Sequence, residues 1–170
     1  MVELDDRLQA ITRGQARPAG AAECIELARL CCLRNLHATA VRFFTQAFAA
    51  DPKLADNQAV SYRYRAACAA AQAGCGQDEG AARPDEVGRS RLRRQALEWL
   101  RADLARRASR LPAAPQDRAV LVAVLRRWQN DPALAGVRDA SALAKLPSAE
   151  RARWQKLWAD IATTLAKARR

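Results

Sequence analysis

Apolar residues in this chain recur at intervals of three and four, and this spacing restricts the fold more than any other feature of the sequence. Within 147–168 the large side chains follow one another at i, i+3, i+4, i+7 and i+11: Trp154, Leu157, Trp158, Ile161 and Leu165. Such a spacing places them on one face of an α-helix. No run of alternating apolar and polar residues occurs, and Val and Ile are sparse. The chain is therefore predicted to be all-α, without a convincing strand.

Glycine and proline divide the chain into a series of predicted helices. We expect helices over about 1–12, 21–33, 38–52, 58–73, 90–109, 116–130 and 147–168. The polar segment 75–88 contains further Gly and Pro residues and is predicted to be a loop. Asp131-Pro132 is typical of a helix start, with an acidic cap and a proline in the first turn. Asp139 is a candidate cap of a second short turn through Leu146.

The length and composition are consistent with one domain. A chain of 170 residues can bury a core of its own, so we expect a single all-helical domain over 1–170. Aromatic residues make up only 5% of the chain, and alanine supplies many of its hydrophobic residues, which favours closely packed helices. All four tryptophans lie after residue 98. The segment 111–170 is therefore expected to be a C-terminal helical cap, continuous with the helices before it.

The segment 21–56 carries a more specific pattern of small and large residues. Its two predicted helices are joined by a short turn at 34–37. The positions that define the pattern are Leu27 and Ala28 in the first helix, and Ala40, Phe44, Ala47 and Pro52 in or after the second. A small residue at Ala40 lets a neighbouring helix approach closely, Phe44 fills the space beside it, and Pro52 opposes continuation of the helix.

This segment resembles a tetratricopeptide repeat, in which two antiparallel helices occupy about 34 residues. Cys24 stands at the usual tryptophan position of that repeat, and Asn35 stands near its usual glycine. A second, looser hairpin is expected over 57–110, with the loop 75–88 inserted between its helices. The resemblance implies antiparallel helical hairpins that form a short, tetratricopeptide-like α-solenoid.

A broader resemblance covers most of the chain. The segments RYRAACAAAQAGCGQDE, LRRQALEWLRADLA, RRWQNDPALAGVRD and WQKLWADI are similar, in this order, to a C-terminal tail of large multidomain bacterial proteins. There the tail follows tetratricopeptide repeats, often behind a serine/threonine protein kinase domain or a WD-repeat propeller. The resemblance implies an accessory or regulatory interaction region, and it makes a kinase domain, in the same chain or another, a candidate partner.

The sequence shows no constellation for catalysis, so we expect a non-enzymatic protein without a cofactor or a metal site. A kinase would need a glycine-rich phosphate loop, an HRD-type catalytic loop and a DFG motif, and none of these occurs. His37, the only histidine, stands at a predicted helix start, where capping or surface exposure is favoured over catalysis. Asp78, Glu79, Asp85 and Glu86 lack the spacing of a calcium-binding loop and are interpreted as solvated loop charge.

The cysteines and the N-terminus indicate a reducing cytoplasm. The five cysteines are odd in number and match no metal-binding spacing: Cys24, Cys31, Cys32, Cys68 and Cys75. We interpret them as reduced thiols that pack as small hydrophobic side chains. The N-terminus is acidic and amphipathic, unlike a secretion signal, and the longest apolar run, 119–125, is too short to cross a bilayer. We expect a cytoplasmic protein with no membrane partner.

The basic charge lies in the later part of the chain. The formal net charge is +11, yet the first 60 residues hold seven basic and seven acidic side chains. Such a surplus can attract nucleic acid or an acidic protein. Arginine outnumbers lysine about six to one, and a GC-rich coding bias would produce the same composition without any selected partner. The arginines of 90–109 are accordingly interpreted as a broad solvated helix surface.

Two functions are consistent with these features. The favoured one is a non-catalytic protein–protein interaction or scaffold module, with a groove lined by the first helix of each hairpin. Candidate groove residues are Arg29, Arg34, Arg63 and Arg65, which would suit an acidic or C-terminal carboxylate-bearing peptide. The alternative is a nucleic-acid-binding module that uses the basic helices of 90–170.

Overall fold

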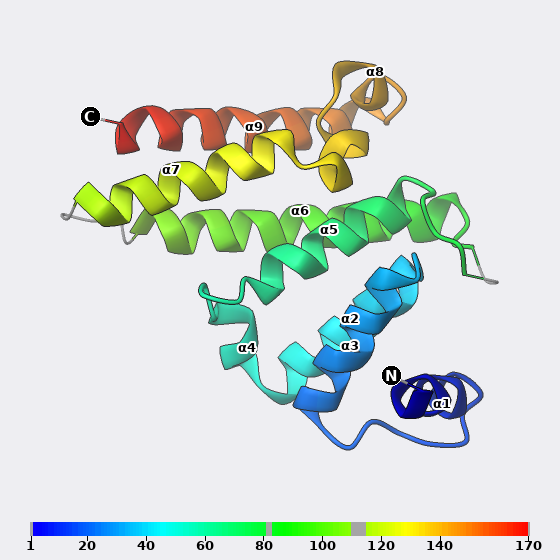
Figure 1. Ribbon diagram of the computed structural model, residues 1–170. Helices are drawn as coiled ribbons and strands as arrows, with labels where there is room; N and C mark the ends of the chain where they lie inside the picture. The colour runs from blue at the N-terminus through cyan, green and yellow to red at the C-terminus, as the bar shows by residue number, and fades with distance from the viewer. Residues whose placement is uncertain (1, 81–82, 110–114, 170) are drawn as a thin grey trace.

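The structure, a computed structural model, describes residues 2–80, 83–109 and 115–169, and within them it is all-α with no strand (Figure 1). The helices are α1 (Val2–Thr12), α2 (Ala21–Leu33), α3 (His37–Ala50), α4 (Pro52–Asp56), α5 (Tyr62–Gly74), α6 (Glu86–Ser109), α7 (Pro115–Asn130), α8 (Ala140–Leu143) and α9 (Ser148–Ala168), with a 3₁₀ helix, η1 (Pro132–Val137), between α7 and α8. The prediction of an all-α fold is confirmed.

The long helices pack in antiparallel pairs: α2 with α3, α5 with α6, and α7 with α9 (Figure 1). Helix α5 also contacts α3 on one side and η1 on the other, so it joins the first pair to the C-terminal helices. Among the residues that the structure describes, no helix is both long and apolar enough to span a bilayer.

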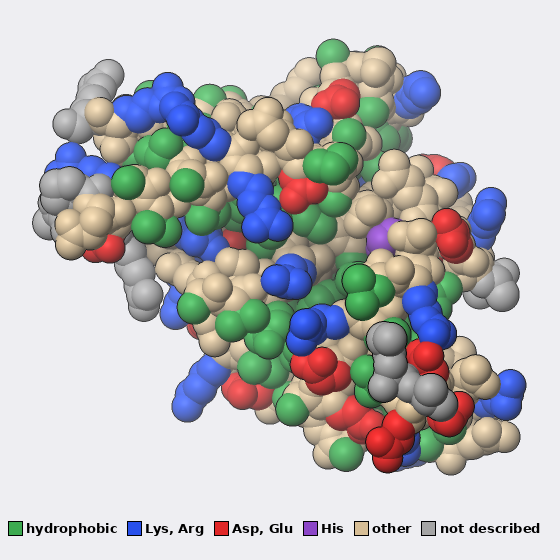
Figure 2. Space-filling model, viewed as in Figure 1, with side chains coloured by type: hydrophobic (Ala, Val, Ile, Leu, Met, Phe, Trp, Pro, Cys, Tyr) green, Lys and Arg blue, Asp and Glu red, His purple; other side chains and the backbone are tan. Residues whose placement is uncertain are grey.

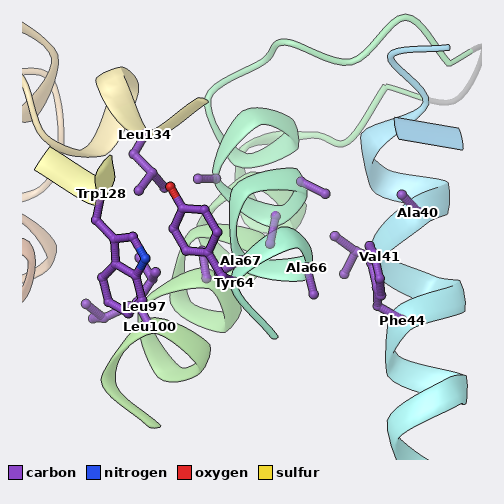
Figure 3. Packing of buried hydrophobic residues seen from close by; sticks show 14 of the residues in the cluster. Ala40, Val41, Phe44, Tyr64, Ala66, Ala67, Leu97, Leu100, Trp128 and Leu134 are labelled. Atoms are coloured by element: carbon purple, nitrogen blue, oxygen red, sulfur yellow. The ribbon is translucent and has the colours of Figure 1, made fainter. Parts of the chain in front are cut away.

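Small side chains allow α5 to pack between two neighbours. Ala66 of α5 lies toward α3, on the side of Val41 and Phe44, whereas Leu97 and Leu100 of α6 lie on the opposite side of α5 (Figure 3). Ala40, Phe44 and Ala66 have no exposed surface. Because the distance between two helices depends on the side chains at their contact, an alanine-rich α5 can approach both α3 and α6 closely.

The six positions of the hairpin pattern lie as follows. Five have no exposed surface: Leu27, Ala28, Ala40, Phe44 and Ala47. Pro52 is exposed and stands in the first turn of α4, a short helix that the sequence did not reveal. The Asp51 carboxylate accepts a hydrogen bond from the backbone N–H of Lys53 at 3.0 Å. Helix α3 therefore ends at Ala50, and α4 begins with a capping carboxylate and a proline.

Helix α5 begins at Tyr62, later than the expected start at residue 58. The side-chain oxygen of Asn57 accepts hydrogen bonds from the backbone N–H groups of Ala59 and Val60, at 3.1 and 3.3 Å. Ser61 then takes a left-handed conformation with φ of 56°. A turn held by an asparagine side chain competes with helix formation, which is why the helix starts after it.

Helix α6 begins at Glu86, so the last residues of the expected loop 75–88 are helical. The Asp85 carboxylate accepts a hydrogen bond from the backbone N–H of Gly88 at 2.8 Å and thereby caps the helix. This first turn was not expected because Val87 is exposed and continues no apolar stripe. Residues 81 and 82 of the loop lie outside the described residues.

The C-terminal helices form a core around tryptophan side chains. Trp128 and Trp154 are fully buried, and the indole N–H of Trp158 donates a hydrogen bond to the carbonyl of Val137 at 2.8 Å. The Asp131 carboxylate caps the first turn of η1 at 3.0 Å, as expected. Buried hydrophobic residues from every described helix except α4 belong to one cluster, including Leu8 of α1. Residues 111–114 of the expected cap lie outside the described residues.

The expected turn through Leu146 is present, because the backbone N–H groups of Lys145 and Leu146 donate to the carbonyls of Ala142 and Leu143, both at 3.1 Å, but the expected cap is not. Helix α8 ends at Leu143, and the Asp139 side chain makes no capping hydrogen bond. Its carboxylate accepts instead from Nε of Arg138 at 3.0 Å.

His37 is buried, so the expectation of a capping or exposed side chain is wrong. It is 4% exposed and makes no capping hydrogen bond at the start of α3. Asp78 is buried as well, so it is not solvated loop charge. The reason is that its loop folds back on the turn between α2 and α3. There the backbone N–H of Glu79 donates to the carbonyl of Asn35 at 3.0 Å, and the Asn35 amide donates to the Glu79 carboxylate at 3.1 Å.

The buried imidazole predicts a pH dependence of stability. Burial lowers the pKa of His37, although Asp78 and Glu79 oppose the shift. In the unfolded chain the imidazole takes up a proton near pH 6.5, whereas the folded protein resists protonation. The contribution of the neutral imidazole to the free energy of unfolding is complete above about pH 6.5 and is lost as the pH falls.

We therefore expect the free energy of unfolding of His37→Gln to fall less steeply than that of the wild type as the pH drops through the range in which histidine titrates. Urea unfolding at a series of pH values measures both proteins. His37 is the only histidine, so their difference isolates this side chain, and parallel pH profiles would contradict the prediction.

Candidate functional site

A groove of about 340 Å³ lies where α2, α5 and α7 face one another. Figure 2 shows the hollow in the middle of one face, with basic side chains along its edges and acidic side chains gathered farther away, over α1. Its floor is formed by Phe44 and Tyr64, and the thiols of Cys32 and Cys68 lie beside them. The groove is therefore bounded by the first helix of each antiparallel pair.

Three arginines from three helices line the groove: Arg29 of α2, Arg65 of α5 and Arg127 of α7. Arg29 pairs with Glu26 of its own helix at 3.1 Å, and both side chains are about half exposed. Arg65 and Arg127 have no carboxylate partner within the part of the chain that the structure describes. The groove consequently carries exposed positive charge that no carboxylate of the described residues pairs with at Arg65 or Arg127.

Tyr64 holds the floor of the groove in place. Its hydroxyl donates a hydrogen bond to the Asp131 carboxylate at 2.7 Å. Its ring stacks on Trp128 with centroids 5.1 Å apart and an interplanar angle of 7° (Figure 3). The Arg127 guanidinium lies 5.8 Å from the centre of the same tyrosine ring. This cation–π contact orients Arg127 without neutralising its charge.

Asp131 adds little free acceptor capacity to the groove. One carboxylate oxygen accepts from the Tyr64 hydroxyl, and the other accepts from the backbone N–H of Ala133 at 3.0 Å. Burial, together with the negative charge beside it, raises the pKa of Tyr64, so the phenol stays protonated and keeps donating. The carboxylate therefore serves to anchor η1 to α5.

The cysteine thiols of the groove are not activated as nucleophiles or as metal ligands. Burial raises the pKa of Cys32 to about 11 and that of Cys68 to about 12. Both remain thiols at neutral pH, whereas a nucleophile or a metal ligand must be a thiolate. All five cysteines are free. No group of three or more His, Cys, Asp or Glu side chains among the described residues is arranged to hold a metal ion. What the groove offers is a charged and apolar binding surface.

Leu33 gives the groove an apolar edge. The residue ends α2 and is 81% exposed, which is the largest exposure among the big hydrophobic side chains that the structure describes. A single exposed apolar residue is common on protein surfaces, but this one stands beside the arginines of the groove. A ligand with both acidic and apolar groups would satisfy the two features together.

The structure brings together two of the four arginines expected in the groove, Arg29 and Arg65. Arg34 lies elsewhere, where its guanidinium pairs with Asp5 at 2.6 Å and ties α1 to α2. Arg63 is also outside the groove and pairs with Asp56 at 2.8 Å. Successive residues on a helix are about 100° apart, so Arg63 and Arg65 point to different sides of α5.

Arg127 was not found from the sequence. It belongs to a segment expected to be the cap, and only the packing of α7 and η1 beside α5 brings it to the groove. A signal was nevertheless present, because the residue precedes Trp128 at the end of an apolar helix.

Comparison of the chain with protein-family models, curated proteins and solved structures found no match.

Proposed function

We propose that this chain is a non-catalytic protein–protein interaction module that binds an acidic segment of a partner protein in the groove between α2, α5 and α7. The observation that carries the proposal is the convergence of Arg29, Arg65 and Arg127 from three helices on one recess. Two of these arginines lack a carboxylate partner among the described residues. A bound peptide would supply the missing acids.

The recognition mechanism follows from the side chains of the groove. A guanidinium can hold a carboxylate with two parallel hydrogen bonds, which gives geometric selectivity as well as affinity. Arg127 is oriented in advance by the Tyr64 ring, so less conformational freedom is lost when the ligand binds. Leu33 at the edge offers an apolar contact to a large side chain next to the acid.

The proposal also retains the relation to tetratricopeptide-repeat tails. In its support, α2–α3 and α5–α6 are successive antiparallel pairs, and the groove lies on the side of their first helices. The pair α7–α9 would close the array as a cap and contribute Arg127 from its own first helix. We infer an accessory or regulatory role, with a kinase domain in the same or another chain among the candidate partners.

The test uses selection from a random peptide library, because the partner is unidentified. We expect the wild-type protein to enrich peptides that combine Asp or Glu with a neighbouring large apolar residue. The variant Arg65→Glu/Arg127→Glu should bind the selected peptides at least about tenfold more weakly, since a hydrogen bond to a charged group contributes about 1.5–3 kcal/mol. Fluorescence anisotropy with one labelled peptide measures the affinities.

The control is Arg91→Glu/Arg126→Glu, which reverses two exposed charges on α6 and α7 outside the groove. It should bind within about twofold of the wild type once long-range electrostatics are screened by physiological salt. If both variants lose the same peptide affinity, the peptide does not bind in the groove. Tight binding of duplex DNA by the wild type, weakened in Arg91→Glu/Arg126→Glu and with no peptide enriched, would favour the alternative nucleic-acid-binding function of 90–170.

A further inference from the structure

A second, smaller cavity lies between α6 and the first turns of α9, and it shares no residue with the groove. Its volume is about 40 Å³. Two sets of residues at helical spacing line it: Ser90, Arg94 and Leu97 from α6, and Glu150, Arg153 and Trp154 from α9. Both helices therefore present one face to the same small space.

Trp154 lines this cavity and carries an unsatisfied hydrogen-bond donor. The side chain has no exposed surface, and its indole N–H has no hydrogen-bond partner in the described part of the chain. An indole nitrogen can only donate. A buried donor without an acceptor costs free energy, so such a group in a native structure calls for a ligand or a water that accepts from it.

The other polar groups around the cavity also favour an acceptor. Arg94 and Arg153 are exposed toward solvent and have no carboxylate partner among the residues that the structure describes. A third guanidinium is close by, since Arg101 donates to the backbone carbonyl of Arg153 at 3.2 Å.

Glu150 is the only acid at the cavity wall, and its charge is already matched. One carboxylate oxygen accepts from Nε of Arg93 at 2.5 Å, and the other accepts from Nη2 of the same residue at 3.1 Å. The guanidinium of Arg93 is buried behind it. The pair leaves Arg94 and Arg153 as surplus positive charge.

The size of the cavity limits the ligand to a small group. One water molecule needs roughly 10–15 Å³ of such space, so 40 Å³ has room for a few oxygen atoms. We propose that this cavity binds a tetrahedral oxyanion of the phosphate class, with the Trp154 indole N–H and the guanidinium groups of Arg94 and Arg153 as its donors.

The indole N–H groups allow a direct test by two-dimensional ¹H–¹⁵N NMR. The chain has four tryptophans, and the signal missing from Trp154→Phe identifies Trp154. Inorganic phosphate is titrated against sodium chloride at constant ionic strength. We expect a saturable shift of the Trp154 signal with phosphate, and an affinity at least tenfold lower in Arg94→Gln and in Arg153→Gln.

Arg91→Gln is the matched control, because it removes an exposed positive charge from the same helix at a position that does not line the cavity. It should bind phosphate within twofold of the wild type. If it weakens binding as much as Arg94→Gln does, the attraction is non-specific and the proposal fails. A Trp154 signal that stays in place up to tens of millimolar phosphate, or that moves equally with chloride, also overturns it.

A second titration with a phosphoserine peptide distinguishes the sources of the anion. A phosphate monoester carried by a partner molecule would move the Trp154 signal at lower concentration than the free ion. Free phosphate acting more strongly would assign the cavity to the inorganic ion. Because the phosphate titration has by then moved the Trp154 signal, either order of affinity supports the site.

Discussion

Replacing Gly74 by alanine is expected to destabilise the protein by about 2–3 kcal/mol, because the added methyl group overpacks the contact between α5 and α6. A Cβ atom there would lie 2.5 Å from Cγ of Arg93, 2.9 Å from the Arg93 backbone nitrogen and 3.0 Å from the Arg89 carbonyl oxygen. Two of these atoms are backbone, so the helices would have to separate. Urea unfolding followed by circular dichroism measures the change.

The sign of this effect is informative. In an exposed helix the same substitution would stabilise by roughly 0.5–1 kcal/mol, because alanine loses less backbone entropy than glycine. Gly80→Ala is the control, since its Cβ would meet only the Asp78 carboxylate at an ordinary distance of 3.5 Å. It should change the free energy of unfolding by less than about 0.5 kcal/mol. Gly74→Ala at wild-type stability would mean that α5 and α6 do not approach so closely.

The helices of this fold could be predicted because burial imposes a helical period on the sequence. The apolar residues of 21–33 mark α2 with its observed bounds, and those of 147–168 mark α9 to within one residue at its start. Where polar side chains determine the end of a helix, the spacing of apolar residues does not predict that boundary. Asn57 delays α5 and Asp85 starts α6, and the side chains of both act by accepting hydrogen bonds from backbone N–H groups.

Only part of the groove could be predicted, because a groove depends on which helix faces meet. Arg29 and Arg65 lie on first helices whose pairing the hairpin pattern indicates. Arg127 reaches the same recess through the packing of η1 on α5, which no local pattern encodes. Arg63 and Arg65 lie on different sides of α5, because residues two apart on a helix are separated by about 200°.

The burial of charged side chains was the feature least predictable from the sequence. The arginines of 90–109 were expected to form a solvated surface, yet Arg93 and Arg107 are buried. Arg107 pairs with Asp103 one turn away at 3.2 Å. Arg93 instead depends on Glu150, 57 residues later in the chain. A charge can be buried only where a partner is placed for it, and a partner so distant is visible only after folding.

Replacing Glu150 by methionine is accordingly expected to cost about 3 kcal/mol of unfolding free energy, because it leaves a buried cation without its main partner. The Arg93 side chain is only 4% exposed, and that of Glu150 is 14% exposed. Besides Glu150, Arg93 donates to the carbonyl of Gly74 at 2.6 Å and to the exposed Glu86 at 2.9 Å. Neither contact can replace the two hydrogen bonds that the Glu150 carboxylate accepts. Urea unfolding again provides the measurement.

Two further variants separate burial from the mere loss of an ion pair. Glu86→Met breaks a pair with the same arginine, but Glu86 is 64% exposed, so solvent compensates and the cost should stay below about 1 kcal/mol. The double variant Arg93→Met/Glu150→Met removes both charges and should be more stable than Glu150→Met alone, since no unpaired ion remains inside. If Glu150→Met and Glu86→Met cost the same, or if the double variant is the least stable, Arg93 is not a buried cation that depends on Glu150. The expected order would instead identify this pair as the link that holds the start of α9 against α5 and α6.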